Sequence, residues 1–263
     1  MRLRRIMEHM KTQNWFAVAL DFVIVVIGVG VAMYGQQWLS DRQQRADMAV
    51  AEKAIQAELF YNYGNAKERL AVAHCRAQSY KAIAAKLLAP GENWTGIARL
   101  DNKDYGAVLP VVFRSPQRTW GSSIWKAELG RGTFNLMTDK RRAELDSIFT
   151  QADEIQLLQT DIFELQGRLN VLAVNTPIGR NDRLRYYDVL AELDVKSGSL
   201  EINAQQLIVS FDELDIPLSE KDRQGALKFL DSHFERVRKI YGECYQPQEF
   251  PILDANFEKA KTP

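Results

Sequence analysis

Two cysteines and three histidines are the side chains best suited to redox or metal chemistry in this sequence. His74 lies beside Cys75, but His9 and His233 form no ligand spacing with that pair, so the pattern predicts no metal site. A lone pair of cysteines in an oxidising compartment most often forms one disulfide. We predict a bridge between Cys75 and Cys244, with two free thiols as the alternative.

Hydroxyl and glycine motifs give no catalytic set. Ser122 and Ser123 have no histidine or acid at a recognisable spacing, and no Gly-x-Ser-x-Gly elbow occurs in the sequence. The run Gly130–Thr133 lacks the strand and the Lys-Ser/Thr pair of a phosphate loop, so it predicts a turn that ends a helix. We therefore predict no catalytic residue, no cofactor and no enzymatic activity.

Aromatic and acidic side chains in the second half of the chain also have structural interpretations. We expect Trp120, Trp125 and Phe134 in a hydrophobic core, not in a ligand cage. A set of acids mostly avoids the apolar seam of its predicted helix. This pattern indicates a solvated face and not a general acid–base pair. The acids are Asp146, Asp153, Glu154, Asp161 and Glu164.

The most specific feature of the sequence is an apolar segment over residues 16–34, in which Asp21 is the only charged residue. At about 1.5 Å per residue, a helix of this length covers roughly 28 Å, close to the ~30 Å hydrocarbon layer of a bilayer. Trp15 and Trp38 would then lie at the two membrane interfaces, where indole rings are favoured. We predict a transmembrane helix over residues 15–38.

Basic residues before this segment set its predicted orientation. Residues 1–14 carry four basic residues against one acid, whereas the charges just after the segment nearly cancel. The positive-inside rule keeps this basic stub in the cytoplasm and sends residues 39–263 across the membrane. A cleaved secretory signal is the alternative, because Gly30–Ala32 loosely fits a cleavage site. Against it, Asp21 interrupts the apolar run, which also continues past Ala32.

One face of the predicted transmembrane helix is small and carries its acid. At about 100° per residue, six positions fall within an arc of roughly 80°: Ala17, Asp21, Val25, Gly28, Ala32 and Gly35. Small residues let a second helix approach closely, and a carboxyl group in lipid needs a polar or basic partner. The face predicts pairing with another membrane protein or with a second copy. The alternative is that Asp21 is protonated or reaches the headgroups.

The remainder of the chain predicts an all-α fold, in which the transmembrane helix continues into an antiparallel periplasmic helical bundle over residues 39–246. Prolines and glycines mark a long loop over 90–118 with one short strand at 111–113, either functional or a strap laid over the helices. Residues 247–263 predict an extended C-terminal tail over the surface. Apolar spacing and capping residues predict helices over 39–89, 120–129, from Thr138 to Asn175, over 182–195 up to a break at Ser197–Ser199, and from Ser219 to Cys244, with 200–216 ambiguous.

The N-terminal segment resembles a family of bacterial single-pass membrane proteins whose function is not established. The resemblance rests on Gln13–Val18 followed by Leu20–Val29, and continues more weakly through Leu109-Pro110, Trp120 and the turn from Gly130. Met33–Gly35 departs from the more polar segment expected there. The resemblance implies a bacterial inner membrane, with the acid at Asp21 as part of the family pattern.

Composition excludes one class of partner and leaves three functions to weigh. The chain carries 34 Lys+Arg and 34 Asp+Glu, so it has no charge excess typical of nucleic-acid binding. We expect a membrane-anchored accessory or scaffold subunit that binds the lipid bilayer and other inner-membrane proteins or itself. A periplasmic ligand-sensing bundle is the first alternative, although few residues remain in the cytoplasm to receive a signal. A periplasmic enzyme of unrecognised type is the second.

Overall fold

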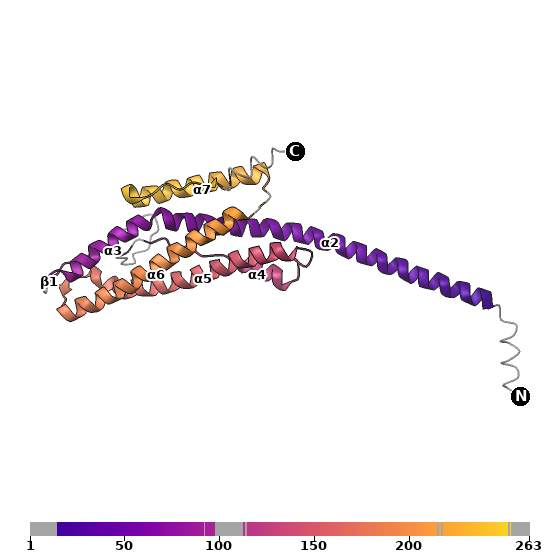
Figure 1. The fold of residues 1–263 in the computed structure, drawn as a ribbon, viewed down its shortest axis with the longest axis horizontal. Coiled ribbons are helices and arrows are strands. Elements are labelled where there is room, and N and C mark those ends of the chain that lie inside the picture. The colour runs from indigo at the N-terminus through magenta and orange to yellow at the C-terminus, as the bar shows by residue number, and fades with distance from the viewer. Residues whose placement is uncertain are drawn as a thin grey trace, which may run out of the picture. The chain divides into compact units, whose positions relative to one another are not determined.

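The computed structural model describes residues 15–91, 93–97, 113, 115–214, 216, 218–251 and 253. The predicted basic stub over 1–14, most of the loop over 90–118, the strand predicted at 111–113 except Phe113, and the tail beyond Leu253 lie outside these residues. The described part of the chain is almost entirely helical, which confirms the prediction of an all-α fold (Figure 1).

The helices and strands follow one another in the chain with short connections, apart from the segment between β1 and α4. The elements are α2 (Trp15–Ala71), α3 (Ala73–Leu88), β1 (Asn93–Trp94), α4 (Ser123–Gly130), α5 (Asp139–Leu169), the 3₁₀ turn η1 (Asn170–Ala173), β2 (Thr176–Pro177), α6 (Arg180–Glu213), α7 (Glu220–Tyr241) and the 3₁₀ turn η2 (Gly242–Cys244). The strands β1 and β2 pair antiparallel, with Asn93 opposite Pro177 and Trp94 opposite Thr176.

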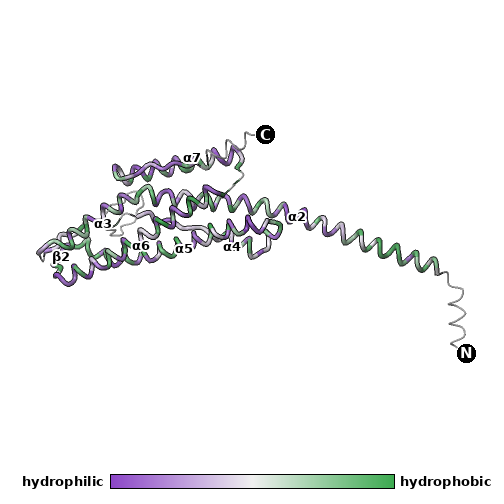
Figure 2. Tube along the Cα trace, in the orientation of Figure 1, coloured by the Kyte–Doolittle hydropathy of each residue, from purple (hydrophilic) through white to green (hydrophobic). Residues whose placement is uncertain are grey.

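The chain divides into two compact units, residues 1–52 and 53–263. In the first unit, α2 contains an 18-residue window that is long and apolar enough to cross a membrane, and no part of that window is buried. Figure 2 shows this window as the most hydrophobic stretch of α2. The second unit holds the hydrophobic core and is described by itself below.

Capping residues start two of the long helices where the sequence predicts. The Thr138 side chain accepts a hydrogen bond from the backbone N–H of Arg141 and begins α5, and Ser219 accepts one from Asp222 and begins α7. Gly132 has a φ of 73° in the turn after α4, which confirms that Gly130–Thr133 is a turn.

The predicted break at Ser197–Ser199 is wrong, because α6 runs without interruption from Arg180 to Glu213. Serine and glycine cost at most about 1 kcal/mol each in a helix interior. That cost is smaller than the gain from burying the apolar side chains on either side of the break, such as Leu193 and Leu200, both 0% exposed. The buried Ser197 hydroxyl also lies 3.2 Å from the Tyr80 hydroxyl of α3. Tertiary packing therefore overrides local propensity, and the ambiguous stretch after residue 200 is helical.

Side-chain contacts give the direction of α6 relative to α3 and to α5. Arg76 of α3 pairs with Glu201 and Tyr80 with Ser197, so α3 and α6 run in opposite directions. Lys196 of α6 pairs with Asp161 of α5, and Gln151 donates to the carbonyl of Asn203, so α5 and α6 are also antiparallel. In each pair of helices, contacts at higher residue numbers on one helix meet lower residue numbers on the other, as antiparallel packing requires.

The segment before α4 runs back along α2 and lets α5 follow the direction of α2. Asn65 donates to the carbonyl of Thr119, and Asn62 exchanges two hydrogen bonds with Gly121. On the other side of the segment, Gln159 of α5 is bonded to Arg118 and Gln156 to Trp120. The described end of the predicted loop is therefore a strap between two helices, held by side-chain amides.

Aromatic side chains fill the core beside this strap. Trp120, Trp125 and Phe134 are 4%, 1% and 1% exposed, which confirms their predicted place in the core. The indole of Trp125 stacks between Phe134 and Phe149, with ring centroids 5.2 Å and 5.6 Å apart.

The C-terminal tail was predicted to extend over the surface, and Pro247, Glu249 and Pro251 are exposed, whereas two apolar side chains further along turn inward. The backbone N–H of Gln246 donates to the carbonyl of Ala71 at 2.8 Å. The Phe250 ring lies 5.2 Å from that of Phe234 and 6.3 Å from that of Tyr63, and Leu253 is fully buried. The prolines predicted an extended backbone but did not predict that Phe250 and Leu253 would pack inward.

Candidate functional site

Helix α7 is attached to α2 and α3 at three levels. Lys53 and Asp222 approach to 4.0 Å near the start of α7, and the Glu68 carboxylate meets His233 further along. The predicted disulfide is present just beyond the end of α7, where the sulfur atoms of Cys75 and Cys244 are 2.10 Å apart. Because residue numbers rise along both partners, α7 runs in the same direction as α2.

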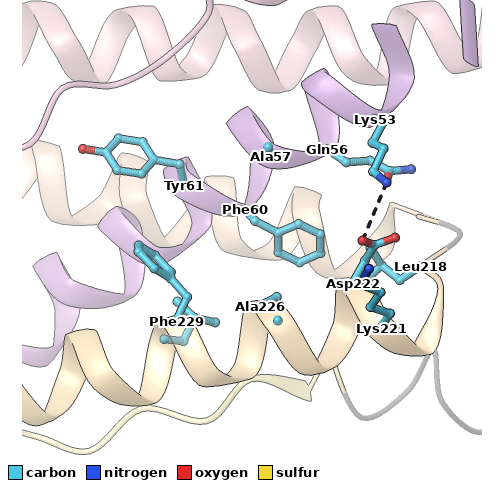
Figure 3. Close-up of a pocket in the computed structure, with 12 residues that line it drawn as sticks. Lys53, Gln56, Ala57, Phe60, Tyr61, Leu218, Lys221, Asp222, Ala226 and Phe229 are labelled. Atoms are coloured by element: carbon cyan, nitrogen blue, oxygen red, sulfur yellow. Dashed lines mark ion pairs between the residues drawn. The ribbon is translucent and has the colours of Figure 1, made fainter. Parts of the chain in front are cut away.

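Between the first two levels lies a groove of about 520 Å³, which we call the α2–α7 groove. Small residues of both helices, including Ala57, Gly225 and Ala226, leave space between the two backbones. The side chains of Phe60 and Phe229 lie in this space, with Lys53 and Asp222 at one end (Figure 3). Phe229 is half exposed. The groove is therefore an open, largely apolar surface with some aromatic side chains and with charges at one end.

A buried carboxylate forms the polar contact between α7 and the core. The Glu68 side chain is only 2% exposed and accepts hydrogen bonds from Arg118 at 2.7 Å and 2.9 Å, while its Oε2 lies 2.9 Å from His233 Nε2. Burial alone would raise the pKa of Glu68, but the hydrogen bonds from His233 and Arg118 outweigh it, and the pKa lies below its usual value. Glu68 is thus an ionised group that joins α2, the strap and α7.

A second polar cluster joins the buried side chains of Tyr63 and Lys67 to the exposed Asp212 near the C-terminal end of α6. The Tyr63 hydroxyl donates to Asp212 at 3.1 Å, and burial with this neighbouring charge raises the pKa of Tyr63. Burial lowers the pKa of Lys67, against the opposing effect of Asp212 and Glu249. Partial burial raises the pKa of Asp212, against the lowering effects of its hydrogen bond from Tyr63 and of the nearby charge of Lys67. These groups hold α2, α6 and the tail together.

The acids of α5 are more engaged than the predicted solvated face implies. Asp146 accepts from the Trp125 indole at 3.2 Å, and Asp153 accepts from the Ser122 hydroxyl at 2.5 Å. Asp161 pairs with Lys196. Asp146, Asp161 and the other two acids, Glu154 and Glu164, are exposed, as the predicted solvated face requires, whereas Asp153 is half-buried. The partners of Asp146, Asp153 and Asp161 come from α4, the strap and α6. Helical periodicity places an acid on a face but does not reveal which neighbour reaches it.

The small face predicted on the apolar segment is part of α2. Asp21, Val25, Gly28 and Ala32 are exposed, as is Gly35, and a Cβ added at Gly28 or Gly35 would meet nothing within 4 Å. Trp38 is also exposed, with the Arg42 guanidinium 5.7 Å from its ring centroid. The side chains of Trp15 and Ala17 lie outside the described residues.

The chemistry available at these sites is that of binding. Among the residues that the structure describes, no group of three or more His, Cys, Asp or Glu side chains could hold a metal ion. Both oxygens of Glu68 are occupied by Arg118 and His233, so the carboxylate orients its neighbours. Comparison with protein-family models, curated proteins and solved structures finds no match to this chain.

Sequence reasoning missed the α2–α7 groove and the contact between Glu68 and His233. The signal for the groove was the low side-chain volume at Ala57, Gly225 and Ala226, which becomes meaningful only once the two helices are known to face each other. Nothing in the sequence separates the ionised Glu68 from the exposed acids of α2, because its partners lie 50 and 165 positions away.

Proposed function

We propose that this chain is a membrane-anchored accessory or scaffold subunit of the bacterial inner membrane. Residues 15–38 would cross the membrane with the N-terminus in the cytoplasm, and residues 39–246 would form a periplasmic bundle with antiparallel helix pairs. The protein would bind other inner-membrane proteins or a second copy of itself. It would act by holding partners together instead of by catalysis.

The observation that carries this proposal is the apolar window of α2, which is unburied within the chain and bears one carboxyl group on a face of small residues. A helix that only anchors a protein gains nothing from an acid in the hydrocarbon layer, because burial of the charge in lipid is costly. A partner that hydrogen-bonds Asp21 removes that cost, and Gly28 and Ala32 allow its close approach. The bridge between Cys75 and Cys244 supports export to an oxidising compartment.

The experiment compares the full chain with two variants in mild detergent. Asp21→Leu removes the acid, whereas Ile27→Leu changes an apolar position about 120° away, outside the small face, and serves as the matched control. We expect Asp21→Leu to lose co-purifying membrane partners or cross-linked dimers, and Ile27→Leu to retain them. Equal recovery from the two variants would refute pairing through this face, and recovery of the unaltered chain in the soluble fraction would refute anchorage.

The α2–α7 groove favours a second candidate function, the sensing of an apolar ligand. Its aromatic lining and its volume of about 520 Å³ are within the range of small-molecule sites. Ala226→Leu would fill the groove without touching the membrane segment. If sensing is the function, the unaltered chain binds an apolar fluorescent probe and this variant does not. If the probe binds neither protein, the groove is no ligand site.

A further inference from the structure

Charged and apolar side chains are separated along the α2–α7 groove. The charged residues of its lining lie at the end where α7 begins, namely Lys53 of α2 with Lys221 and Asp222 of α7. Further along the two parallel helices, the rings of Phe60 and Phe229 lie in the groove (Figure 3). A groove with one charged end and one apolar end matches a ligand that has a charged head and an apolar chain.

The apolar end of the groove is closed, which limits the length of a ligand. A Cβ added at Gly64 would lie 3.1 Å from Cδ2 of Leu230, so α7 contacts the backbone of α2 there. Leu230 is 1% exposed. At about 1.5 Å per residue, α2 extends roughly 16 Å from Lys53 to Gly64. A groove of this length, with a volume of about 520 Å³, accommodates a single extended chain.

One glycine leaves the wall of the groove open without a packing reason. Gly225 lies in the interior of α7, where glycine costs up to about 1 kcal/mol relative to alanine. Its φ is not positive, and a Cβ added there would meet nothing within 4 Å. Neither backbone geometry nor crowding therefore requires a glycine at this position, and its absent side chain keeps the groove accessible.

The charges at the open end favour an anionic head group. Lys53 and Asp222 approach only to 4.0 Å, and their side chains are 73% and 41% exposed, so water screens this pair. Lys221, which is exposed, supplies a second ammonium group to the lining. The adjacent Glu220 is paired with Arg223. The groove lining therefore carries two positive charges and one negative charge at this end.

We propose that the α2–α7 groove binds a free fatty acid, whose chain lies along Phe60 and Phe229 and whose carboxylate faces Lys53 and Lys221. This assignment names the ligand of the second candidate function, the sensing of an apolar ligand, and rests on it. Burial of the chain against apolar side chains supplies most of the affinity. A neutral ligand gains nothing from the two lysines, and a cationic one is repelled by the net positive charge.

Photolabelling of the full-length chain in lipid nanodiscs tests this assignment. The probe is a diazirine analogue of dodecanoate, and mass spectrometry measures its attachment to the α7 peptide that contains Phe229. Unlabelled dodecanoate, dodecanol and dodecylammonium have the same chain length and are compared as competitors. We expect dodecanoate to compete roughly tenfold better than dodecylammonium, because its carboxylate pairs with two exposed lysines.

Exchange of the lysines tests the charge at the open end. Lys53→Gln combined with Lys221→Gln should remove the advantage of dodecanoate over dodecylammonium. The matched control combines Lys81→Gln with Lys228→Gln, two exposed lysines outside the groove lining, and should keep that advantage. These variants change exposed side chains, so they remain informative if a variant that fills the groove does not fold. Equal selectivity of the two double variants would overturn the placement of the carboxylate.

Filling the groove tests its location. Ala226→Leu places a larger side chain in the lining and should abolish labelling of the α7 peptide. Ala191→Leu makes the same change at an exposed position of α6 and should leave labelling unchanged. Circular dichroism checks that both variants keep the helical content of the unaltered chain.

The competitors separate failure of this inference from failure of the proposed function. If dodecanol and dodecylammonium compete as well as dodecanoate, the sensing candidate stands and the fatty-acid assignment is overturned. If the α7 peptide is not labelled, or if Ala226→Leu and Ala191→Leu are labelled alike, the groove is not the site and both are overturned. Stronger competition by lysophosphatidylglycerol than by dodecanoate would overturn the free fatty acid in favour of a phospholipid ligand.

Discussion

Replacement of Glu68 by glutamine tests whether the buried carboxylate holds α7 on the core. The glutamine oxygen can keep one hydrogen bond, but its NH₂ group then faces an N–H donor of Arg118 or His233. The variant thus loses about two charge-assisted bonds, each worth roughly 1.5–3 kcal/mol. The Arg118 side chain is 30% exposed, so water replaces part of the hydrogen bonding that its guanidinium loses. We expect a decrease of about 2–4 kcal/mol in the free energy of unfolding at pH 7.

The pH dependence of this difference gives a second measurement. The pKa of folded Glu68 lies below its usual value, because the bonds to His233 and Arg118 outweigh burial. The stabilisation by the carboxylate is therefore complete above the unfolded pKa of about 4.3 and is lost as pH falls through the folded pKa. The two proteins should differ most near neutral pH and converge in acid.

Urea unfolding of the full-length protein in mild detergent measures these quantities. Tryptophan fluorescence is a suitable signal, because Trp94, Trp120 and Trp125 are buried. Glu235→Gln is the matched control, since Glu235 lies on α7, two positions after His233, and makes an exposed pair with Lys239. The reasoning is refuted if Glu68→Gln unfolds at the same urea concentration as this control at pH 7, or if the gap widens in acid.

Three further substitutions have effects that follow from the structure and are measurable by the same denaturation. Glu58→Ala removes the acceptor of the Ile124 and Trp125 backbone N–H groups, each at 3.2 Å, and should cost about 1–2 kcal/mol; no change would mean that water caps α4. Trp125→Ala empties the stacked core and should cost about 3–5 kcal/mol with loss of near-ultraviolet dichroism; a retained spectrum would contradict the stacking. Replacement of Cys75 and Cys244 by serine opens a loop of 169 residues, for which loop entropy gives about 5 kcal/mol. Reducing agent should destabilise the unaltered chain and not this variant, and equal sensitivity would refute the bridge.

Local signals in the sequence predicted the parts of the fold that local forces decide. Thr138 and Ser219 start their helices because a side-chain oxygen satisfies an N–H three positions ahead, which is visible in the sequence. The disulfide was predictable because the chain has two cysteines and therefore one possible internal pair. The apolar window of α2 was predictable from composition and length alone.

Long-range packing decides the parts that the sequence did not predict. Ser197–Ser199 has the composition of a break, yet it stays helical because its neighbours are buried against α3 and α5. The ionisation of Glu68 depends on Arg118 and His233, whose proximity arises only when the strap and α7 are in place.

The distance between the two cysteines along the chain sets an order of events during synthesis. Cys75 leaves the ribosome 169 residues before Cys244. At about 5–20 residues per second, the first thiol waits roughly 10–30 s for its partner. No other cysteine of the chain competes with it in this interval. Closure of the bridge therefore reports that the nascent chain has been completed at least through α7.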